Sequence, residues 1–387
     1  MKASAFVYPW DVVGDPAAPE RLAALGIEQV TLASAYHSTR ALTPRHPRHR
    51  VVTAEYAAVL YPPGDRWSGR GLRPCPAGRW APADAYGEAA AALAEAGLPA
   101  HTWVVLAHNS RLGAEHPDTS VVNAYGDRYP WAPCIAQPAT RAYLVDLAAE
   151  AAVRPGAHGT ELESLGWYGL AHLHAHDKTS GVALGDAGQY LMSLCFCPSC
   201  RTGYGAHSLD ADALAAAVRD ALEPLWRGEA DDGGWTGVAK RLGEDTAAAT
   251  RAWREHTART LQEEAVAAVR AGAPDGFQVL LHADPVPHHC GANAGVDPAH
   301  ILSVADGVVV PCTGGPDLLA PFAAQGHADA VLAANFTIVS GMGGSPATLA
   351  ADAARAGAHG ATELRLYHAG LASDTDLAAV RAALSAR

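Results

Sequence analysis

The sequence predicts a single-domain (β/α)8 TIM barrel over residues 1–387, an α/β fold in which eight parallel strands alternate with helices. One observation is that short β-branched or aromatic runs alternate with longer Ala- and Leu-rich runs to the end of the chain. Another is that no GxGxxG follows the first strand, which disfavours an open doubly wound sheet. The third is the number of strand candidates, which start near Ser4, Glu28, His101, Thr160, Phe277, Gly307, Ala330 and Thr362.

Helix start signals and two insertions complete the predicted organisation. Asp297 and Ser345 each precede a proline, where a side-chain oxygen can cap free amides and proline fits the first helical turn. Residues 373–387 are expected to form the last helix. The alternating run RVVTAEYAAVLY predicts a β-hairpin insertion over 41–80, after the second strand. A larger insertion over 167–276, after the fourth strand, holds a cysteine cluster and amphipathic helical runs.

Composition excludes several classes of partner. The net charge of -12 argues against binding to a phosphate backbone, so we expect no nucleic-acid partner. The N-terminus lacks a secretory apolar core, and we find no run of about 18 apolar residues, so we expect no membrane partner. Seven cysteines, three of them within six positions, suit a metal site in a reducing compartment. We therefore expect a cytoplasmic protein.

The cysteine cluster predicts a structural zinc site. The sequence LCFCPSCR places Cys195, Cys197 and Cys200 on one turn, where three thiolates can bind zinc without strain. Cys134 is the candidate fourth ligand, because the loops after strands three and four are neighbours on one rim of a barrel. Four cysteines leave no open position for water. The alternative is a set of packed, unreactive thiols; no role is assigned to Cys75, Cys290 and Cys312.

The stretch from His108 to Arg201 carries a specific series of motifs. They are N-A-Y-G-D at 123–127, the cysteine at 134, a proline at 138, R-A-Y-L at 141–144, a strand ending in glutamate and C-x-C-x-x-C at 195–200. This series resembles the family 42 glycoside hydrolases, the zinc-carrying β-galactosidases. The resemblance implies that the four cysteines above hold a structural zinc. It also implies a general acid at the end of strand four and self-association, so a homo-oligomer is possible.

The fourth strand supplies the candidate proton donor. It reads GTELESLGWYG, so Glu161 and Glu163 alternate onto one face, although neither follows the asparagine of the family's Asn-Glu pair. Glu163 lies nearer the C-terminal rim, where barrel enzymes carry their chemistry, and is predicted to be the general acid/base. Glu161 is expected to be its neighbour or a substrate hydrogen-bonder, and two such carboxyls tend to raise one pKa. The alternative is that one glutamate forms an ion pair inside the barrel.

The seventh strand departs from the resemblance. It reads VLAANFTIVSG and has no carboxylate where the family has its nucleophilic glutamate. A hydrolase needs a second group, either about 5 Å from the first in a retaining enzyme or farther away in an inverting one. Asp284 and Asp11 are the candidate replacements, and either fits an inverting mechanism more easily.

Histidines and aromatic residues are predicted to line the barrel mouth. Many of the 19 histidines follow strand ends, together with aromatic side chains of the kind that pack on sugar rings. The predicted substrate-binding residues are Trp10, Asp11, Tyr36, His37, His108, Asn109, His174, His282, Asn335, Tyr367 and His368. A rival interpretation of the loop after strand five is a second, catalytic metal site formed by His282, Asp284, His288 and His289.

These observations favour a carbohydrate-active hydrolase that acts on a small carbohydrate or glycoside, with Glu163, Glu161 and Asp284 as candidate catalytic residues. One alternative is a sugar isomerase, epimerase or lyase on the same barrel, in which Glu163 and a rim histidine exchange a proton. A second is a barrel that binds a glycan without cleaving it. The missing carboxylate on strand seven keeps that last alternative open.

Overall fold

The structure is a closed parallel barrel, which confirms the predicted fold class. The computed structural model describes residues 1–387 except 171–176, 180, 231–232, 327–328 and 387. In order around the barrel, the strands are β1 (Lys2–Val7), β2 (Gln29–Tyr36), β6 (Ala100–Val105), β9 (Ala157–Glu163), β10 (Gln278–Asp284), β12 (Gly307–Pro311), β13 (Val331–Thr337) and β14 (Glu363–Tyr367). β1 pairs in parallel with both β2 and β14, so the sheet closes on itself.

The observed strands begin close to the predicted positions. The largest difference is at β9, which begins at Ala157 rather than Thr160. Every residue of β2 is buried, because helices cover the outside of the barrel and side chains fill its inside. Burial on both faces explains why these strands are nearly continuous apolar runs in the sequence.

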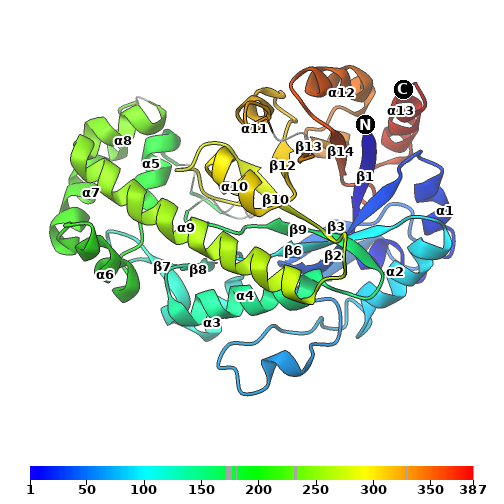
Figure 1. Cartoon of the computed structure of the whole chain (residues 1–387), viewed down its shortest axis with the longest axis horizontal. Helices are drawn as coiled ribbons and strands as arrows, with labels where there is room; N and C mark the ends of the chain where they lie inside the picture. Colours follow the sequence, from blue (N-terminus) through cyan, green and yellow to red (C-terminus); the bar gives the residue numbers. More distant parts are fainter. Residues whose placement is uncertain (171–176, 180, 231–232, 327–328, 387) are drawn as a thin grey trace.

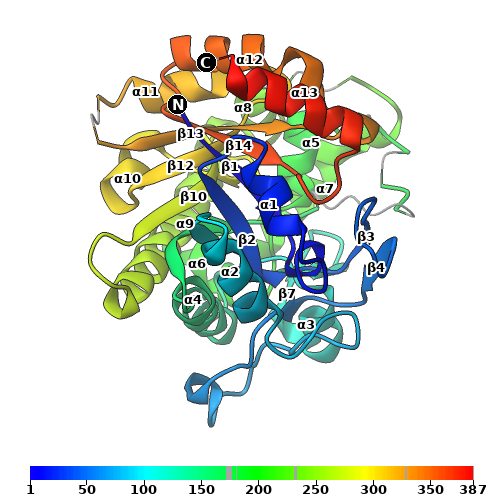
Figure 2. The same ribbon diagram turned by 90° about the vertical axis from the view of Figure 1, so that its right-hand side faces the viewer.

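Helices return the chain from each strand to the next on the outside of the barrel (Figure 2). They are α1 (Ala18–Ala23), α2 (Ala85–Glu95), α4 (Pro138–Ala152), α9 (Glu244–Gly272), α10 (Pro298–Val304), α11 (Ala320–Ala323), α12 (Leu349–Ala358) and α13 (Asp374–Ser385). The long α9 runs beside α4 and leads into β10 (Figure 1). It occupies the end of the larger predicted insertion but serves as a barrel helix.

One of the two predicted helix caps is confirmed, and Ser373 supplies a further cap. Asp297 accepts a hydrogen bond from the backbone N–H of His300 and caps α10. Ser373 caps α13 in the same way. The expectation for Ser345 is wrong, because a short 3-10 turn follows it and its side chain makes no capping hydrogen bond. Among the described residues, no helix combines the length and apolar character needed to span a membrane.

A hairpin follows β2 at the position that the alternating run predicts. β3 (Thr39–Leu42) and β4 (Val51–Ala54) pair antiparallel, and β5 (Ala58–Val59) then pairs antiparallel with β2. The return segment is fixed to α4 by Glu150, a buried carboxylate. Glu150 accepts hydrogen bonds from Trp67 Nε1 at 2.5 Å, Tyr61 Oη at 3.2 Å and the Gly64 N–H at 2.8 Å.

A second hairpin, which the sequence did not predict, lies between β6 and α4. After α3 (Ser110–Glu115), β7 (Ser120–Val122) and β8 (Arg128–Pro133) pair antiparallel. The Asn123 side chain closes their turn by accepting hydrogen bonds from the Tyr125 and Asp127 N–H groups, both at 2.9 Å. The N-A-Y-G-D motif is therefore a hairpin turn.

Four helices follow β9 and form the larger insertion with the first part of α9. They are α5 (Gly185–Met192), α6 (Pro198–Ala206), α7 (Ala211–Trp226) and α8 (Gly234–Leu242). In Figure 1 they gather at the end of the molecule away from α1 and α13. This insertion carries the C-x-C-x-x-C motif, which lies just before and within the first turn of α6.

The inside of the barrel has two different halves. Leu280, Val309, Val331 and Ala333 form a small aliphatic cluster on the side of β10, β12 and β13. On the opposite side, an aromatic cluster includes Phe6, Tyr8, Trp10, Tyr36 and Trp103. The candidate catalytic side chains lie at the border of this aromatic half.

Candidate functional site

The four predicted cysteines come together, and this cluster could hold a metal ion. Their sulfur atoms all lie within 4.8 Å of one another and are buried. Cys134 Sγ lies 3.6 Å from the sulfurs of Cys197 and Cys200 and 3.7 Å from that of Cys195. A tetrahedron of thiolates around zinc, with bonds near 2.3 Å, has edges of about 3.8 Å. The spacing fits such a site, and it is far too long for a disulfide.

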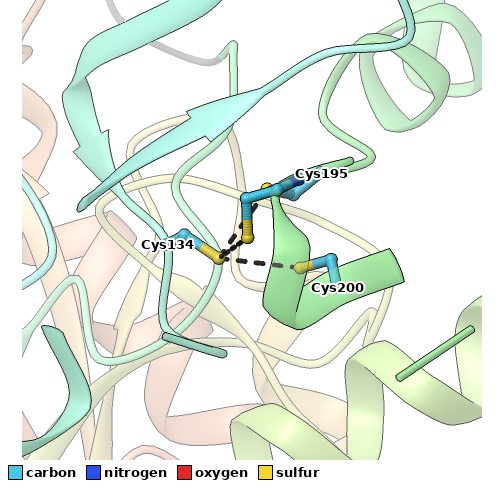
Figure 3. Close-up of side chains that lie close together, drawn as sticks. Cys134, Cys195 and Cys200 are labelled. Carbon is cyan, nitrogen blue, oxygen red and sulfur yellow. Dashed lines mark hydrogen bonds between the residues drawn. The ribbon is translucent and has the colours of Figure 1, made fainter. Parts of the chain in front are cut away.

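The second hairpin and the start of α6 position these thiols. Cys134 follows β8 directly, and the Phe196 N–H donates to the Val122 carbonyl at 2.6 Å, which ties the C-x-C-x-x-C turn to β7. The N–H groups of Val122 and Cys197 point at Cys195 Sγ, at 3.4 and 3.5 Å. Figure 3 shows the sulfurs of Cys134, Cys195 and Cys200 turned toward one another. Hydrogen bonds from Cys134 and its neighbours lower the pKa of the Cys197 thiol, which favours a thiolate.

Glu163 ends β9 at the C-terminal mouth of the barrel. Trp103, on the neighbouring β6, donates an indole hydrogen bond to Glu163 Oε2 at 2.7 Å. His282 Nδ1, on β10, lies 4.0 Å from the same oxygen. The side chain keeps an exposed fraction of 11%, so it is oriented by its neighbours and still reaches solvent. Trp103 is not among the predicted site residues, although its place on a barrel strand next to that of Glu163 could have indicated it.

Glu161 lies in a buried ion pair, which corrects the expectation that it binds substrate. Arg365 Nε, on β14, donates to Glu161 Oε1 at 2.6 Å, and both side chains have 0% exposure. Thr31 Oγ1 donates to the same oxygen at 3.0 Å. His101 and His282 lie 3.7 and 3.5 Å from the carboxylate.

The charge on Glu161 also corrects the expected pKa. Burial would raise its pKa, but the charge of Arg365 and hydrogen bonds from the two histidines hold the pKa well below the usual 4.5. Glu161 is therefore an ionised structural carboxylate below the mouth. The missed signal was Arg365 itself, a cation in the middle of the barrel strand ELRLY.

Tyrosines surround the mouth beside Glu163. Tyr8 Oη donates to Tyr36 Oη at 3.0 Å, and Tyr367 packs near both. Burial raises the pKa of Tyr36 well above 10, and the nearby charges of Tyr367, Tyr8 and Glu163 add to the shift. These hydroxyls therefore stay protonated at neutral pH and can donate hydrogen bonds.

His37 and His108 extend this wall in one stack of rings. The His37 ring stacks on Tyr36 with 4.2 Å between centroids and lies 4.7 Å from His108. His108 stacks in turn on Tyr168 at 4.3 Å. Burial, followed by the charge of Glu163, raises the pKa of Tyr168 above its usual value of 10. The structure thus joins two of the predicted histidines to the tyrosines of the mouth.

Four other predicted substrate-binding residues have structural contacts instead. Trp10 is 2% exposed and stacks on Tyr8. Asn109 caps α3 by accepting from the Leu112 N–H at 3.0 Å. His368 is fully buried, and burial lowers its pKa to about 3. Asp11 accepts from the Tyr8 N–H at 2.8 Å in the short helix Pro9–Asp11.

Burial raises the pKa of Asp11 to about 7, despite the hydrogen bond from the backbone of Tyr8 and the charge of Arg45. With a side-chain exposure of 6%, Asp11 is poorly placed to act as a second catalytic carboxylate. A strand-end position in the sequence does not tell whether a side chain faces the mouth or caps the next turn.

Strand seven brings an amide to the barrel where the resemblance implies a carboxylate. Asn335, on β13, pairs in register with Arg365, and its Oδ1 is buried without a hydrogen-bond partner among the described residues. Thr337, two residues further, shares a hydrogen bond with Thr313 at 3.1 Å. His174, another predicted substrate ligand, lies outside the described residues.

The loop after β10 does not assemble the rival metal site. His282 points toward Glu161 and Glu163, whereas His288 packs against the rings of Tyr190 and Trp235. Within the described part of the chain, the four cysteines are the one group of three or more ligands that converges.

Asp284 instead binds the next part of its own loop. Its Oδ1 accepts from the Val286 N–H at 2.8 Å, and its Oδ2 lies 3.0 Å from His289 Nδ1. Both carboxylate oxygens are therefore engaged, and Asp284 and His289 form a hydrogen-bonded pair at the rim of the barrel.

Comparison with known proteins finds similarity of fold and no match of sequence. No family model and no curated protein sequence matches it. Among solved structures, the whole chain is similar to α-L-fucosidase isoenzyme 2 from Paenibacillus thiaminolyticus (TM-score 0.60, 11% identity, 49% of that chain). It is also similar to a β-galactosidase from the psychrophilic Marinomonas ef1 (0.55, 9%, 59% of that chain). A third similar structure is the β-amylase catalytic domain from Paenibacillus polymyxa (0.57, 14%, 98% of that chain).

The chain thus spans about half of the fucosidase and somewhat more of the β-galactosidase. At these identities the likeness is one of fold, a barrel that these glycosidases share. The family 42 resemblance is supported to that extent, and membership of that family is not confirmed.

Proposed function

We propose that this protein is a carbohydrate-active hydrolase, with its active site at the C-terminal mouth of the barrel and Glu163 as general acid/base. The arrangement around Glu163 carries the proposal. A partly exposed carboxylate ends a barrel strand, an indole N–H orients it, and protonated tyrosines stand beside it. Barrel enzymes draw their catalytic groups from this rim, and hydroxyl donors and aromatic rings suit a sugar.

The structural neighbours support the same class of substrate. The three neighbours above are named as glycosidases, so this barrel shape is one on which glycoside hydrolysis occurs. We infer a small carbohydrate or glycoside as the substrate. The missing carboxylate on β13 separates this chain from a simple retaining hydrolase, because such an enzyme needs a second carboxylate beside the first.

The test is release of nitrophenol from a panel of aryl galactosides, glucosides, arabinosides and fucosides. We expect wild type to cleave at least one, and Glu163→Gln to lose a hundredfold or more in kcat, since general acid/base groups contribute about 10²–10⁴-fold. Glu88→Gln, an exposed glutamate on α2, is the matched control and should keep full activity. Turnover of sugars without water incorporation would instead favour an isomerase, and tight glycan binding without turnover a binding module.

We propose further that the metal at the four cysteines is zinc and that it is structural. Four thiolates in a closed tetrahedron are the donor set that structural zinc prefers, and they leave no position for a catalytic water. The metal would join the β7–β8 hairpin to the insertion after β9. Elemental analysis should find one zinc per chain in wild type and in Cys75→Ser, a cysteine outside the cluster, and none in Cys134→Ser.

A further inference from the structure

The chemistry at the mouth needs a second proton-transfer group, and the loop after β10 offers one that differs from the residues expected there. Asp284 is not free, because both its oxygens accept hydrogen bonds. Its partner His289 keeps a side-chain exposure of 31%, and its Nε2 lies 3.9 Å from Asp186 Oδ2 on α5. Asp284, His289 and Asp186 all line one polar pocket.

This pocket lies next to Glu163 along the rim. β9 and β10 are adjacent and pair Leu162 with Leu281, so His282 is level with Glu163, and Asp284 lies one step further toward the mouth on the same face. With strands about 4.8 Å apart and a rise of about 3.3 Å per residue, the α-carbons of Glu163 and Asp284 are about 8 Å apart.

The loop is also fixed to the residues that follow Glu163. The Ser164 N–H donates to the Ala292 carbonyl at 2.8 Å, and the Gly291 N–H donates to the Trp167 carbonyl at 3.0 Å. These contacts hold the pocket at a constant distance from the Glu163 carboxylate. The loop that carries His289 is therefore anchored beside the end of β9, on the same rim of the barrel as Glu163.

We propose that His289, oriented by Asp284, is the proton donor to the leaving group in the hydrolysis proposed above, and that Glu163 accepts the proton of the attacking water. The water oxygen bonds to the anomeric carbon while the bond from that carbon to the leaving oxygen breaks. Glu163 takes the water proton, and His289 Nε2 gives its proton to the leaving oxygen. This inference rests on the proposed function; Asp284 is a positioning residue, as in other carboxylate-histidine pairs.

The electrostatics of the pocket fit a donor. The hydrogen bond from His289 to Asp284 raises the His289 pKa above its usual 6.5, against the opposing effect of burial. The charges of Asp284 and Asp186 add to that rise. Burial and the charge of His289 lower the pKa of His288 to about 4, so His288 is neutral. The remaining ionisable groups that line the pocket are Tyr190 and Cys290.

A leaving-group series tests the role of His289. The substrates are the dinitrophenyl, nitrophenyl and phenyl glycosides of a sugar that wild type cleaves. Dinitrophenolate leaves without protonation, so His289→Gln should lose less than about threefold in kcat with it, and about a hundredfold or more with phenyl. Glu163→Gln should lose activity on all three. His300→Gln, which breaks the 2.9 Å pair with Glu263 elsewhere, is the control and should match wild type.

The pH profile and the titration of His289 give a second readout. Asp284→Asn should move the alkaline limb of kcat to lower pH, because the donor must be protonated and loses its stabilising carboxylate. The NMR-titrated pKa of His289 should fall in the same variant, whether or not a substrate is known.

Equal losses across the leaving groups, or a His289 pKa unchanged by Asp284→Asn, would overturn the inference while leaving the hydrolase proposal intact. If wild type cleaves no glycoside, the proposed function fails and this catalytic role fails with it. The titration then separates the two conclusions, since it reports on the pair alone.

Discussion

Removal of the Arg365 guanidinium should be one of the most costly substitutions in the barrel. Arg365→Met leaves the Glu161 carboxylate in a site with 0% exposure, without the cation 2.6 Å away. Breaking a buried pair by removing one partner costs about 3–5 kcal/mol in the free energy of unfolding. For 387 residues, an unfolding entropy of about 2.1 cal/mol/K per residue gives about 0.8 kcal/mol/K. Tm should therefore fall by about 4–6 °C.

The assay is urea and thermal unfolding followed by circular dichroism, as a double-mutant cycle. Glu161→Gln combined with Arg365→Met should recover part of the loss, because residue 161 then carries no unpaired buried charge. Arg355→Met is the control, since Arg355 pairs with Asp352 at the surface with 62% side-chain exposure and should change stability by less than about 0.5 kcal/mol.

The pH dependence of unfolding gives a second test of the Glu161–Arg365 pair. The folded pKa of Glu161 is held below 4.5, so its stabilising contribution is present above the unfolded pKa and is lost as pH falls. In Arg365→Met the buried carboxyl protonates more readily, so the gap in stability between variant and wild type should shrink as pH falls from 7 toward and below 4.5. A loss no larger than that of Arg355→Met, or a gap independent of pH, would refute the reasoning.

Three further outcomes follow from buried groups. Cys200→Ser, or prolonged chelation, should remove the metal and lower Tm, measured by elemental analysis alongside calorimetry; an unchanged Tm with full metal loss would contradict a structural role. The pKa of Asp11 is about 7 in the folded protein, against 3.8 for the ordinary group, so Asp11 stabilises the fold most below about pH 4. This stabilisation is lost as pH rises through 7, by up to about 4 kcal/mol in the free energy of unfolding. In Asp11→Asn the loss should disappear from urea unfolding curves measured across this pH range. Glu150→Gln should cost about 1–3 kcal/mol in urea unfolding, because it weakens acceptors for Trp67 and Tyr61, whereas an unchanged midpoint would show that this anchor is dispensable.

The fold could be predicted because burial on both faces leaves a periodic record in the sequence. The barrel strands are short, largely buried segments between helices, and their predicted starts lie within a few residues of the observed ones. The position of Glu163 followed from the same logic, since a carboxylate near the end of a barrel strand reaches the mouth. The four cysteines could be grouped because strands three and four are neighbours.

The contacts between side chains far apart in the sequence could not be predicted in the same way. Arg365 is 204 residues from Glu161 in sequence, and only the closure of the barrel brings them together. The β7–β8 hairpin was missed because its strands are short and Pro130 interrupts the second. Asn109 is an ordinary helix-capping residue, and its position after a strand made it resemble a ligand.

The ionisable groups near the mouth limit the chemistry that this site can perform. Glu161 is committed to Arg365, Asp284 to His289 and Val286, and Asp11 to the turn after β1. Asp11 Oδ1 and Glu161 Oε2 have no hydrogen-bond partner among the described residues, but both atoms are buried, whereas the Glu163 side chain reaches solvent at the mouth. A double displacement through a covalent glycosyl intermediate needs a second free carboxylate, whereas direct attack by water needs only one acceptor and one donor. If the protein hydrolyses glycosides, the geometry favours the single displacement, with inversion at the anomeric carbon.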